Sequence, residues 1–281
     1  MEMNHMVRHL VSTTFIPMAV GEYFTDYKAI PDAFDRLDVS GLEFTFLPEW
    51  STDRPPLGRT SAGWEDCPRP SYDDLIDTLE EIPTPTVHIN RDVGDMLCSK
   101  DEDIVERGKN TLEDNLAAAE KIGSDVAVIH LWDTRAEHID LEDLWKKIEA
   151  IAERYDQISI AVENVPISAE KLDVEKAWRE LDSLISERHG FTLDLNWCSF
   201  YDNFSELKEF KDRILNVHLQ GYVSKENDES TLKPRKGELD ILRTLEKFCK
   251  EGYDRYITLE INKPGDIGYF KRAISLMKEY S

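Results

Sequence analysis

The sequence alternates eight times between a short β-rich run and a longer stretch with helical periodicity, and this alternation restricts the fold more than any other feature. The stretches 103–122 and 141–155, for example, carry apolar residues at three- and four-residue spacing, and Gly123 is a predicted helix C-cap. Such βα units build a parallel sheet. The predicted strands are 9–16, 41–47, 85–89, 125–131, 157–164, 190–195, 214–219 and 255–261.

Eight units in 281 residues favour a closed barrel over an open doubly wound sheet, which usually has five or six strands. Neither a Gly-x-Gly-x-x-Gly sequence after the first strand nor a Walker-type phosphate loop is found, which argues against nucleotide-binding folds. No Pro-, Gly- or Ser-rich linker divides the chain. We therefore predict that residues 1–281 form a single (β/α)₈ TIM barrel domain.

Charge and cysteine content exclude several classes of partner. A net charge of -23 disfavours nucleic acid, whose binding depends on phosphate neutralisation. The four cysteines lie far apart without a Cys-x-x-Cys pair, which fits a reducing compartment. The polar N-terminus lacks the apolar core of a signal peptide, and no run of about 18 apolar residues exists. We expect a soluble, cytoplasmic protein that binds neither nucleic acid nor membrane.

Ionisable residues lie at the ends of six consecutive predicted strands. Barrel enzymes carry their catalytic groups at the C-terminal ends of strands. Each of these side chains is flanked by aliphatic residues in a strand that should be buried, where an unpaired charge would cost several kcal/mol. A lone strand His or Glu is usually a hydrogen-bonded core residue, but such a series needs another explanation. In chain order the residues are His88, His130, Glu163, Asp194, His218 and Glu260.

The last four of these residues predict a metal site. Three carboxylates and an imidazole from adjacent strands would repel one another as bare anions, and a divalent cation removes that repulsion. The oxygen-rich ligand set favours one Mn²⁺, Mg²⁺ or Co²⁺, with Mn²⁺ first, and leaves Zn²⁺ open. We predict that the metal ligands are Glu163, Asp194, His218 and Glu260.

Other residues are predicted to line the substrate site or to support the fold. His88 and His130 are candidates for contact with the substrate, and the aromatic faces of Trp50, Trp64 and Trp197 are candidates for the walls of a sugar site. The long connections 48–70 and 220–236 are expected to be loops that act as lids or clamps. Structural roles are predicted for Trp132, Trp145, Trp178, His5, His9, His138 and His189.

Four segments resemble the xylose isomerase-like barrels, which include sugar and sugar-phosphate isomerases and epimerases, hydroxypyruvate isomerase, inosose dehydratase and endonuclease IV. They are Ala-Val-Glu-Asn at 161–164, Leu-Asp at 193–194, Asn-Val-His-Leu-Gln at 216–220, and the tail from Gly-Glu-Leu-Asp at 237–240 to Leu-Glu at 259–260. The resemblance follows the strand order over most of the chain. It implies that the matching Glu, Asp, His and Glu bind the metal, and, by analogy, a possible homo-oligomer.

The resemblance also implies a reaction. In the ketose epimerases and hydroxypyruvate isomerase, the two metal-bound glutamates exchange a proton with the substrate, which makes Glu163 and Glu260 the expected acid/base pair. A metal that polarises a carbonyl stabilises the enediolate formed on proton loss, and two carboxylates suffice for the transfers. The expected substrate is a small sugar, sugar phosphate or keto acid. Arg235 lies where relatives carry a substrate-contacting arginine.

Two departures from the family pattern keep other functions open. Trp197 replaces the usual histidine, and Glu-Asn-Val-Pro at 163–166 replaces Glu-Pro-Lys-Pro, which disfavours a two-metal hydride shift. An endonuclease IV-like zinc phosphodiesterase would use His88 and His130 as extra ligands, but Pro-Arg-Lys at 234–236 stands where its Asp-Arg-His is needed. An inosose-type dehydratase and a metal-binding barrel without catalysis also remain open.

Overall fold

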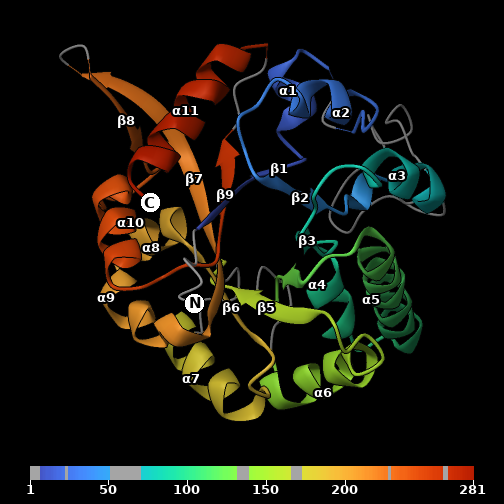
Figure 1. The fold of residues 1–281 in the computed structure, drawn as a ribbon. Coiled ribbons are helices and arrows are strands. Elements are labelled where there is room, and N and C mark those ends of the chain that lie inside the picture. The colour runs from blue at the N-terminus through green and yellow to red at the C-terminus, as the bar shows by residue number, and fades with distance from the viewer. Residues whose placement is uncertain are drawn as a thin grey trace, which may run out of the picture.

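A computed structural model describes residues 7–22, 25–50, 71–131, 139–165, 173–226, 229–261 and 265–281. Eight parallel strands pair in chain order, and the last strand pairs back with the first, so the sheet closes into a barrel (Figure 1). The predicted (β/α)₈ TIM barrel is confirmed. The strands are β1 (Arg8–Ser12), β2 (Gly41–Thr45), β3 (Thr86–His88), β4 (Val126–Ile129), β5 (Ser159–Glu163), β6 (Gly190–Asp194), β7 (Ile214–Glu226) and β9 (Tyr256–Ile261).

Helices connect the strands and surround the barrel (Figure 1). None of those in the described ranges is both long and apolar enough to cross a membrane. They are α1 (Ile16–Ala19), α2 (Ala29–Phe34), α3 (Tyr72–Leu79), α4 (Val93–Leu97), α5 (Glu102–Ile122), α6 (Leu141–Ala152), α7 (Val174–Leu184), α8 (Leu195–Tyr201), α9 (Phe204–Leu207), α10 (Ile241–Lys250) and α11 (Ile267–Glu279), with 3₁₀ turns η1 (Pro48–Trp50) and η2 (Lys208–Arg213).

Aspartates begin many of these helices. In six of them an aspartate side chain accepts a hydrogen bond from a backbone N–H in the first turn, which satisfies a donor that the helix itself leaves unpaired. Part of the acidic excess therefore has a structural use. Helix α5 also ends as predicted, at Gly123 with φ 79°. The capping residues are Asp101, Asp140, Asp173, Asp194, Asp240 and Asp266.

Several predicted bounds differ from those of the structure, and one predicted loop is a hairpin. The first strand ends at Ser12 rather than at residue 16, because Pro17 suits the first turn of a helix and α1 begins at Ile16. The helix predicted over 141–155 ends at Ala152. The connection 220–236, predicted as a loop, is largely a hairpin in which β7 continues to Glu226 and pairs antiparallel with β8 (Glu229–Lys233).

The hairpin forms because its apolar residues share one face. Val223 pairs with Leu232 in the ladder, and Leu232 is buried against the core. The hairpin projects beyond the ring of helices at the upper left of Figure 1. Of the other long connection, 48–70, the structure describes only η1, and residues 51–70 lie outside the described ranges.

The core is mainly aliphatic and aromatic, and the predicted packing roles of Trp145 and Trp178 are confirmed because both are fully buried. His138, His5 and Trp132 lie outside the described residues. The barrel interior also holds buried polar side chains that the sequence analysis did not predict. They come from separate strands and are fully buried: Ser12, Glu43, Thr86, Thr192, Asn216 and Thr258.

Candidate metal centre and active site

The four predicted metal ligands lie at the same end of the barrel, on β5, β6, β7 and β9. The parallel register places Asp194 beside His218, and Gln220 beside Glu260. All four ligands are buried, with Glu260 the most exposed at 7%. Adjacent parallel strands therefore bring together residues that are nearly a hundred positions apart in the chain.

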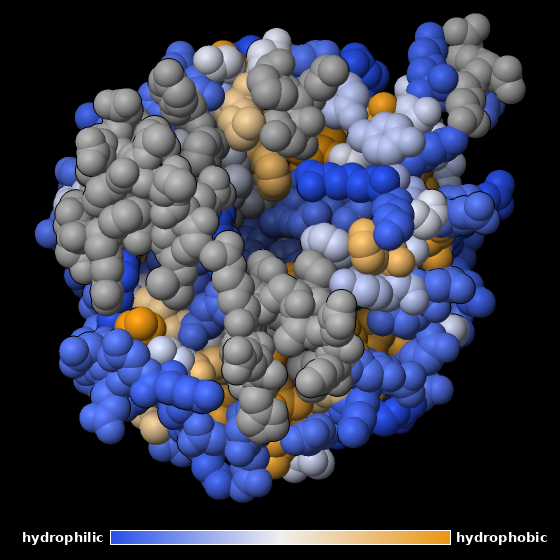
Figure 2. Space-filling view, turned by 180° about the vertical axis from the view of Figure 1, so that it is seen from behind, coloured by the Kyte–Doolittle hydropathy of each residue, from blue (hydrophilic) through white to orange (hydrophobic). Residues whose placement is uncertain are grey.

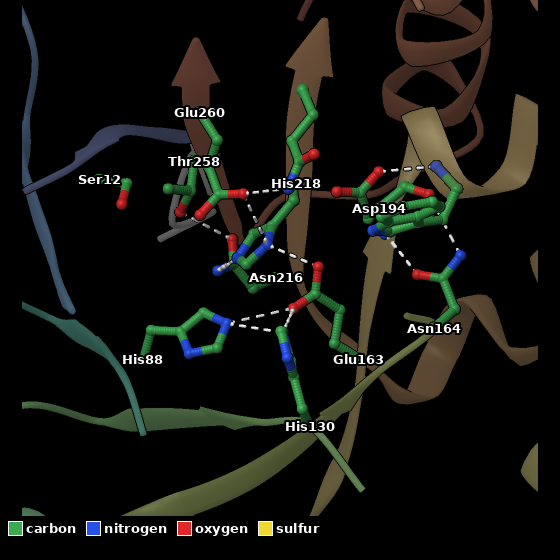
Figure 3. A network of polar contacts seen from close by, with 12 residues as sticks. Ser12, His88, His130, Glu163, Asn164, Asp194, Asn216, His218, Thr258 and Glu260 are labelled. Carbon is green, nitrogen blue, oxygen red and sulfur yellow. Dashed lines mark hydrogen bonds and ion pairs between the residues drawn. The ribbon is translucent and has the colours of Figure 1, made fainter. Parts of the chain in front are cut away.

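His218 occupies the centre of this group (Figure 3). Its Nδ1 lies 3.0 Å from Glu163 Oε1 and 3.7 Å from Glu260 Oε2. Ligand atoms of Glu163, Asp194 and His218 all lie within 4.8 Å of one another. This spacing allows a single cation to contact all three residues.

Asp194 supplies the clearest sign that the residues fit a cation. Its Oδ1 accepts a hydrogen bond from the Trp197 backbone N–H at 2.9 Å, whereas its buried Oδ2 has no hydrogen-bond partner. Burial and the nearby Glu163 carboxylate raise the pKa of Asp194 well above its ordinary value. A buried oxygen without a donor is costly, and coordination to a divalent cation would satisfy it.

Asn164 fixes the position of Asp194. The side-chain amide of Asn164 donates to the Asp194 carbonyl oxygen at 3.1 Å, and the Asp194 backbone N–H donates to Asn164 Oδ1 at 2.6 Å. This reciprocal pair joins the ends of β5 and β6. The residue after Glu163 thus orients the next ligand along the sheet.

The two candidate acid/base glutamates have different environments. Burial by itself raises the pKa of Glu163, but His218 and His130 hold it well below its ordinary value. Burial also raises the pKa of Glu260, and it remains raised although His218 opposes the shift. Two carboxyl groups with different proton affinities suit a pair in which one accepts a proton and the other donates one.

His88 and His130 meet at Glu163 from the other side (Figure 3). Their Nε2 atoms lie 3.0 Å apart, and they lie 3.2 Å and 2.8 Å, respectively, from Glu163 Oε2. The rings stand edge to face, with centroids 4.6 Å apart. Glu163 therefore has one oxygen toward His218 and the other toward two imidazoles, and these three residues form a second group with metal-ligand spacing.

A cavity of about 210 Å³ opens beside these residues. The face of the molecule in Figure 2 has a hollow with a hydrophilic floor near its centre. Its polar wall includes both candidate catalytic glutamates and both histidines, and its apolar wall includes Trp197. The lining residues are Thr14, Phe15, Thr45, Phe46, Leu47, Pro48, His88, Ile89, Arg91, His130, Glu163, Val165, Trp197, Gln220 and Glu260.

Two residues predicted to contact substrate do not line this cavity. The Trp50 ring stacks on Phe44, with centroids 5.7 Å apart, and packs against the core. Arg235 is exposed, and its backbone N–H donates to Asn196 Oδ1. Their roles in substrate binding stay predictions.

The sequence analysis missed Glu43, a fully buried carboxylate on β2. Its Oε2 accepts hydrogen bonds from Thr86 Oγ1 at 3.1 Å, Asn216 Nδ2 at 2.7 Å and Thr258 Oγ1 at 3.4 Å. His218 Nε2 lies 3.1 Å from Glu43 Oε1 and 3.2 Å from Oε2. Glu43 thus contacts the nitrogen of His218 opposite the one that faces the other ligands.

The signal for Glu43 was present in the sequence. It has leucine and phenylalanine neighbours in a predicted strand, the same setting that identified the other carboxylates. Gln220 was also missed, and its side-chain amide donates to Glu260 Oε2 at 2.7 Å. Register explains that contact, because Gln220 and Glu260 are partners across β7 and β9.

Comparison with known proteins identifies the family to which the chain belongs. The family model for the xylose isomerase-like TIM barrel matches residues 96–280, which is well over half of the chain and includes all four candidate ligands. The chain belongs to this family. A curated relative of the xylose isomerase-like chain, an uncharacterized protein of Methanocaldococcus jannaschii, is 26% identical over 185 residues. The chain spans 60% of the length of that relative, and the matched part is 60% of the chain.

Solved structures share the fold of this xylose isomerase-like barrel over almost its whole length. A D-tagatose 3-epimerase-like protein is 19% identical, with a TM-score of 0.65 over 98% of this chain and 97% of that one. D-allulose 3-epimerase from Methylomonas sp., in complex with D-allulose, is 14% identical, with a TM-score of 0.69 over 98% of each chain. An IolI protein with a bound zinc atom is 14% identical, with a TM-score of 0.62 over 98% of this chain and 96% of that one.

Proposed function

We propose that the protein is a metal-dependent isomerase or epimerase that moves a proton at a carbon next to the carbonyl group of a sugar or a related hydroxy-carbonyl compound. The observation that carries the proposal is the pair of buried carboxylates, Glu163 and Glu260. They project from β5 and β9, with β6 and β7 between them, and both line the same cavity. A substrate in the cavity would lie within reach of both carboxylates.

In this proposal Glu163 and Glu260 divide the two proton transfers between them. Glu163, whose pKa is low, accepts the proton from the substrate C–H bond, and the electron pair of that bond passes into an enediolate of the substrate. Glu260 returns a proton to the neighbouring carbon, which gives isomerisation, or to the opposite face of the same carbon, which gives epimerisation. Gln220 orients Glu260 through the hydrogen bond to Oε2.

The metal would be held by Glu163, Asp194, His218 and Glu260, with Mn²⁺ the first candidate. When bound, a divalent cation polarises a carbonyl and stabilises negative charge on its oxygen. The unpartnered Oδ2 of Asp194 and the oxygen-rich ligand set support this assignment. The IolI protein with a bound zinc atom supports a metal in a barrel of this shape.

The comparisons support a small-molecule substrate. The D-allulose complex of the Methylomonas epimerase places a keto-sugar in a barrel of the same fold. A net charge of -23 supports a partner other than nucleic acid. We further propose that the chain acts as one barrel domain in the cytoplasm and that His88, His130 and Trp197 contact the substrate from the cavity wall.

Proton exchange with solvent tests the proposal before a substrate is known. The Mn²⁺-loaded protein is incubated in D₂O with a panel of keto-sugars, and NMR follows loss of the C–H signal next to the carbonyl. The wild type is expected to catalyse exchange. The exchange rate should be at least about 100-fold lower in Glu163→Gln and in Glu260→Gln, as expected for residues that transfer the proton. Glu238→Gln, at an exposed glutamate of the same chain, is the matched control.

The products separate the remaining alternatives. Inversion or migration of the carbonyl identifies an epimerase or isomerase, whereas loss of water identifies a dehydratase. Stoichiometric metal binding without exchange on any member of the panel would contradict catalysis and favour a metal-binding barrel.

A second candidate is a zinc phosphodiesterase, favoured by one observation. His88, His130 and Glu163 form a group with metal-ligand spacing beside the first, and Glu163 belongs to both groups. Two or more zinc ions per chain by plasma mass spectrometry, together with cleavage of an abasic-site duplex, would establish this function in place of the first. One metal per chain without cleavage would exclude it.

A further inference from the structure

Arg91 is placed to receive a negatively charged group in the cavity. It follows β3 three residues after His88, and it lines the same cavity as both candidate catalytic glutamates. Of the described residues on the cavity wall, it is the sole lysine or arginine. An anionic ligand would be repelled by Glu163 and Glu260, so a cation at the wall decides whether such a ligand is accepted.

A buried carboxylate holds the Arg91 side chain. Glu49, in the η1 turn after β2, is 5% exposed, and its Oε1 accepts a hydrogen bond from Arg91 Nη2 at 2.6 Å. An arginine side chain has five N–H donors in a planar fork. This contact uses one end of the fork and leaves its other donors for a ligand.

The backbone around Arg91 is fixed as well. The N–H of Asn90 donates to the fully buried Oδ1 of Asn115 on α5 at 2.9 Å, and the N–H of Asp92 donates to Asn90 Oδ1 at 3.0 Å. Both neighbours of Arg91 are therefore anchored. Side chain and backbone are constrained together, and a constrained guanidinium loses less entropy when it binds a ligand.

We infer that Arg91 binds a terminal carboxylate or phosphate of the substrate. This inference rests on the proposed function and adds the substrate class to it: a hydroxy-carbonyl compound that is an acid or a phosphate ester rather than a neutral sugar. The planar fork of arginine matches two oxygens of either group. The reacting carbonyl end lies toward Glu163 and Glu260, and the anionic end lies toward Arg91. The ion pair with Glu49 orients the fork.

A set of three ligands with one carbon skeleton tests the inference. D-fructose is neutral, D-fructose 6-phosphate carries a terminal phosphate, and D-fructuronate carries a terminal carboxylate. Calorimetry measures the Kd of each for the Mn²⁺-loaded wild type, Arg91→Gln and Arg91→Lys. Arg36→Gln, at an exposed arginine that does not line the cavity, is the matched control.

The wild type is expected to bind at least one of the two anions more tightly than D-fructose. Tighter binding of D-fructose 6-phosphate would identify a phosphate site, and tighter binding of D-fructuronate would identify a carboxylate site. Arg91→Gln should raise the Kd of that anion by about 10- to 100-fold and leave the Kd of D-fructose unchanged, as expected for loss of a charge-assisted hydrogen bond. Arg91→Lys, which keeps the charge without the fork, should lose less. Arg36→Gln should match the wild type.

The inference is overturned if neither anion binds the wild type more tightly than D-fructose. It is also overturned if Arg91→Gln keeps the preference, or if it weakens all three ligands equally. Metal content, measured on each variant, checks that the site is loaded. Proton exchange is recorded separately, so failure of the proposed chemistry and failure of the anion preference are distinguishable.

Discussion

Replacing Glu43 by glutamine should weaken metal binding without removing a ligand. Glu43 Oε2 lies 3.2 Å from His218 Nε2, so the carboxylate favours the tautomer with the proton on Nε2 and the lone pair on Nδ1. Nδ1 lies 3.0 Å from Glu163 Oε1, and a cation held by both residues would take the place of the proton between them. A histidine ligand held by a carboxylate in this way is correctly oriented and is a better electron donor.

The magnitude follows from the contacts that glutamine cannot keep. Glu43 Oε2 accepts hydrogen bonds from three other side chains besides His218, whereas a glutamine has one oxygen and must turn an NH₂ group toward some of these donors. Loss of such a partner typically weakens metal binding by about 10- to 100-fold, or roughly 1.4 to 2.7 kcal/mol. The unsatisfied buried group should also cost about 1–3 kcal/mol of stability.

Titration of the apoprotein with Mn²⁺, with free Mn²⁺ followed by electron paramagnetic resonance, measures the Kd. Thr86→Val is the matched control, because it removes one hydrogen bond to Glu43 but keeps the carboxylate against His218. The control should lose stability and keep the Kd within about threefold of the wild type. A Kd for Glu43→Gln that equals that of the wild type, or a Thr86→Val that weakens metal binding equally, would refute the reasoning.

Three further predictions concern pH and the backbone. Burial by itself lowers the pKa of His218, but the carboxylates of Glu43, Glu163 and Glu260 raise it well above its ordinary value, so a metal must displace a proton from this residue. The affinity for Mn²⁺ should therefore rise with pH, by about tenfold per pH unit for each proton released, and calorimetry in two buffers measures that release. Burial lowers the pKa of His189 to about 4, so as the pH falls the unfolded chain takes up a proton before the folded one does. The free energy of unfolding, measured by urea titration, should therefore fall between pH 6.5 and 4 by roughly 2 kcal/mol after allowance for solvent screening. It should fall less in His189→Asn, which keeps an acceptor for the Ile160 N–H. Gly237 has φ 87°, and an added Cβ would meet the Ser199 carbonyl oxygen, so Gly237→Ala should lower the free energy of unfolding by about 1–3 kcal/mol in thermal unfolding. Gly252 has φ 100° but open space around an added Cβ, so Gly252→Ala should lose clearly less stability.

The barrel could be predicted from the sequence because its signal is repeated eight times. Each β-rich run carries its own periodicity, so an error at one boundary, such as the early end of β1 at Ser12, leaves the topology intact. The hairpin was harder to predict. The connection after Leu219 was predicted to be a long loop, whereas the pairing of Val223 with Leu232 depends on contacts between segments that the local pattern does not encode.

The convergence of the four candidate ligands could be predicted because the C-terminal ends of the strands meet at one end of a barrel. Glu43 was missed because it lies in the middle of β2 rather than at its C-terminal end, although its buried setting is the same. Other features have no sequence signature of this kind. The distance between His88 and His130, and the contact of Arg91 with Glu49, depend on how neighbouring loops fold over the barrel.

The closed barrel separates the cation ligands from much of the cavity wall. All four candidate ligands come from β5 to β9, within the part of the chain that the family model matches, whereas His88 ends β3 and Arg91 follows it, in the part that the model does not match. Under the proposed function, mutations in the connections after β2 and β3 would change which molecules fit without altering Glu163 or Glu260. Substrate choice and the proposed chemistry could then diverge independently in such a chain, and Glu43 and His88 are buried side chains that connect its two parts.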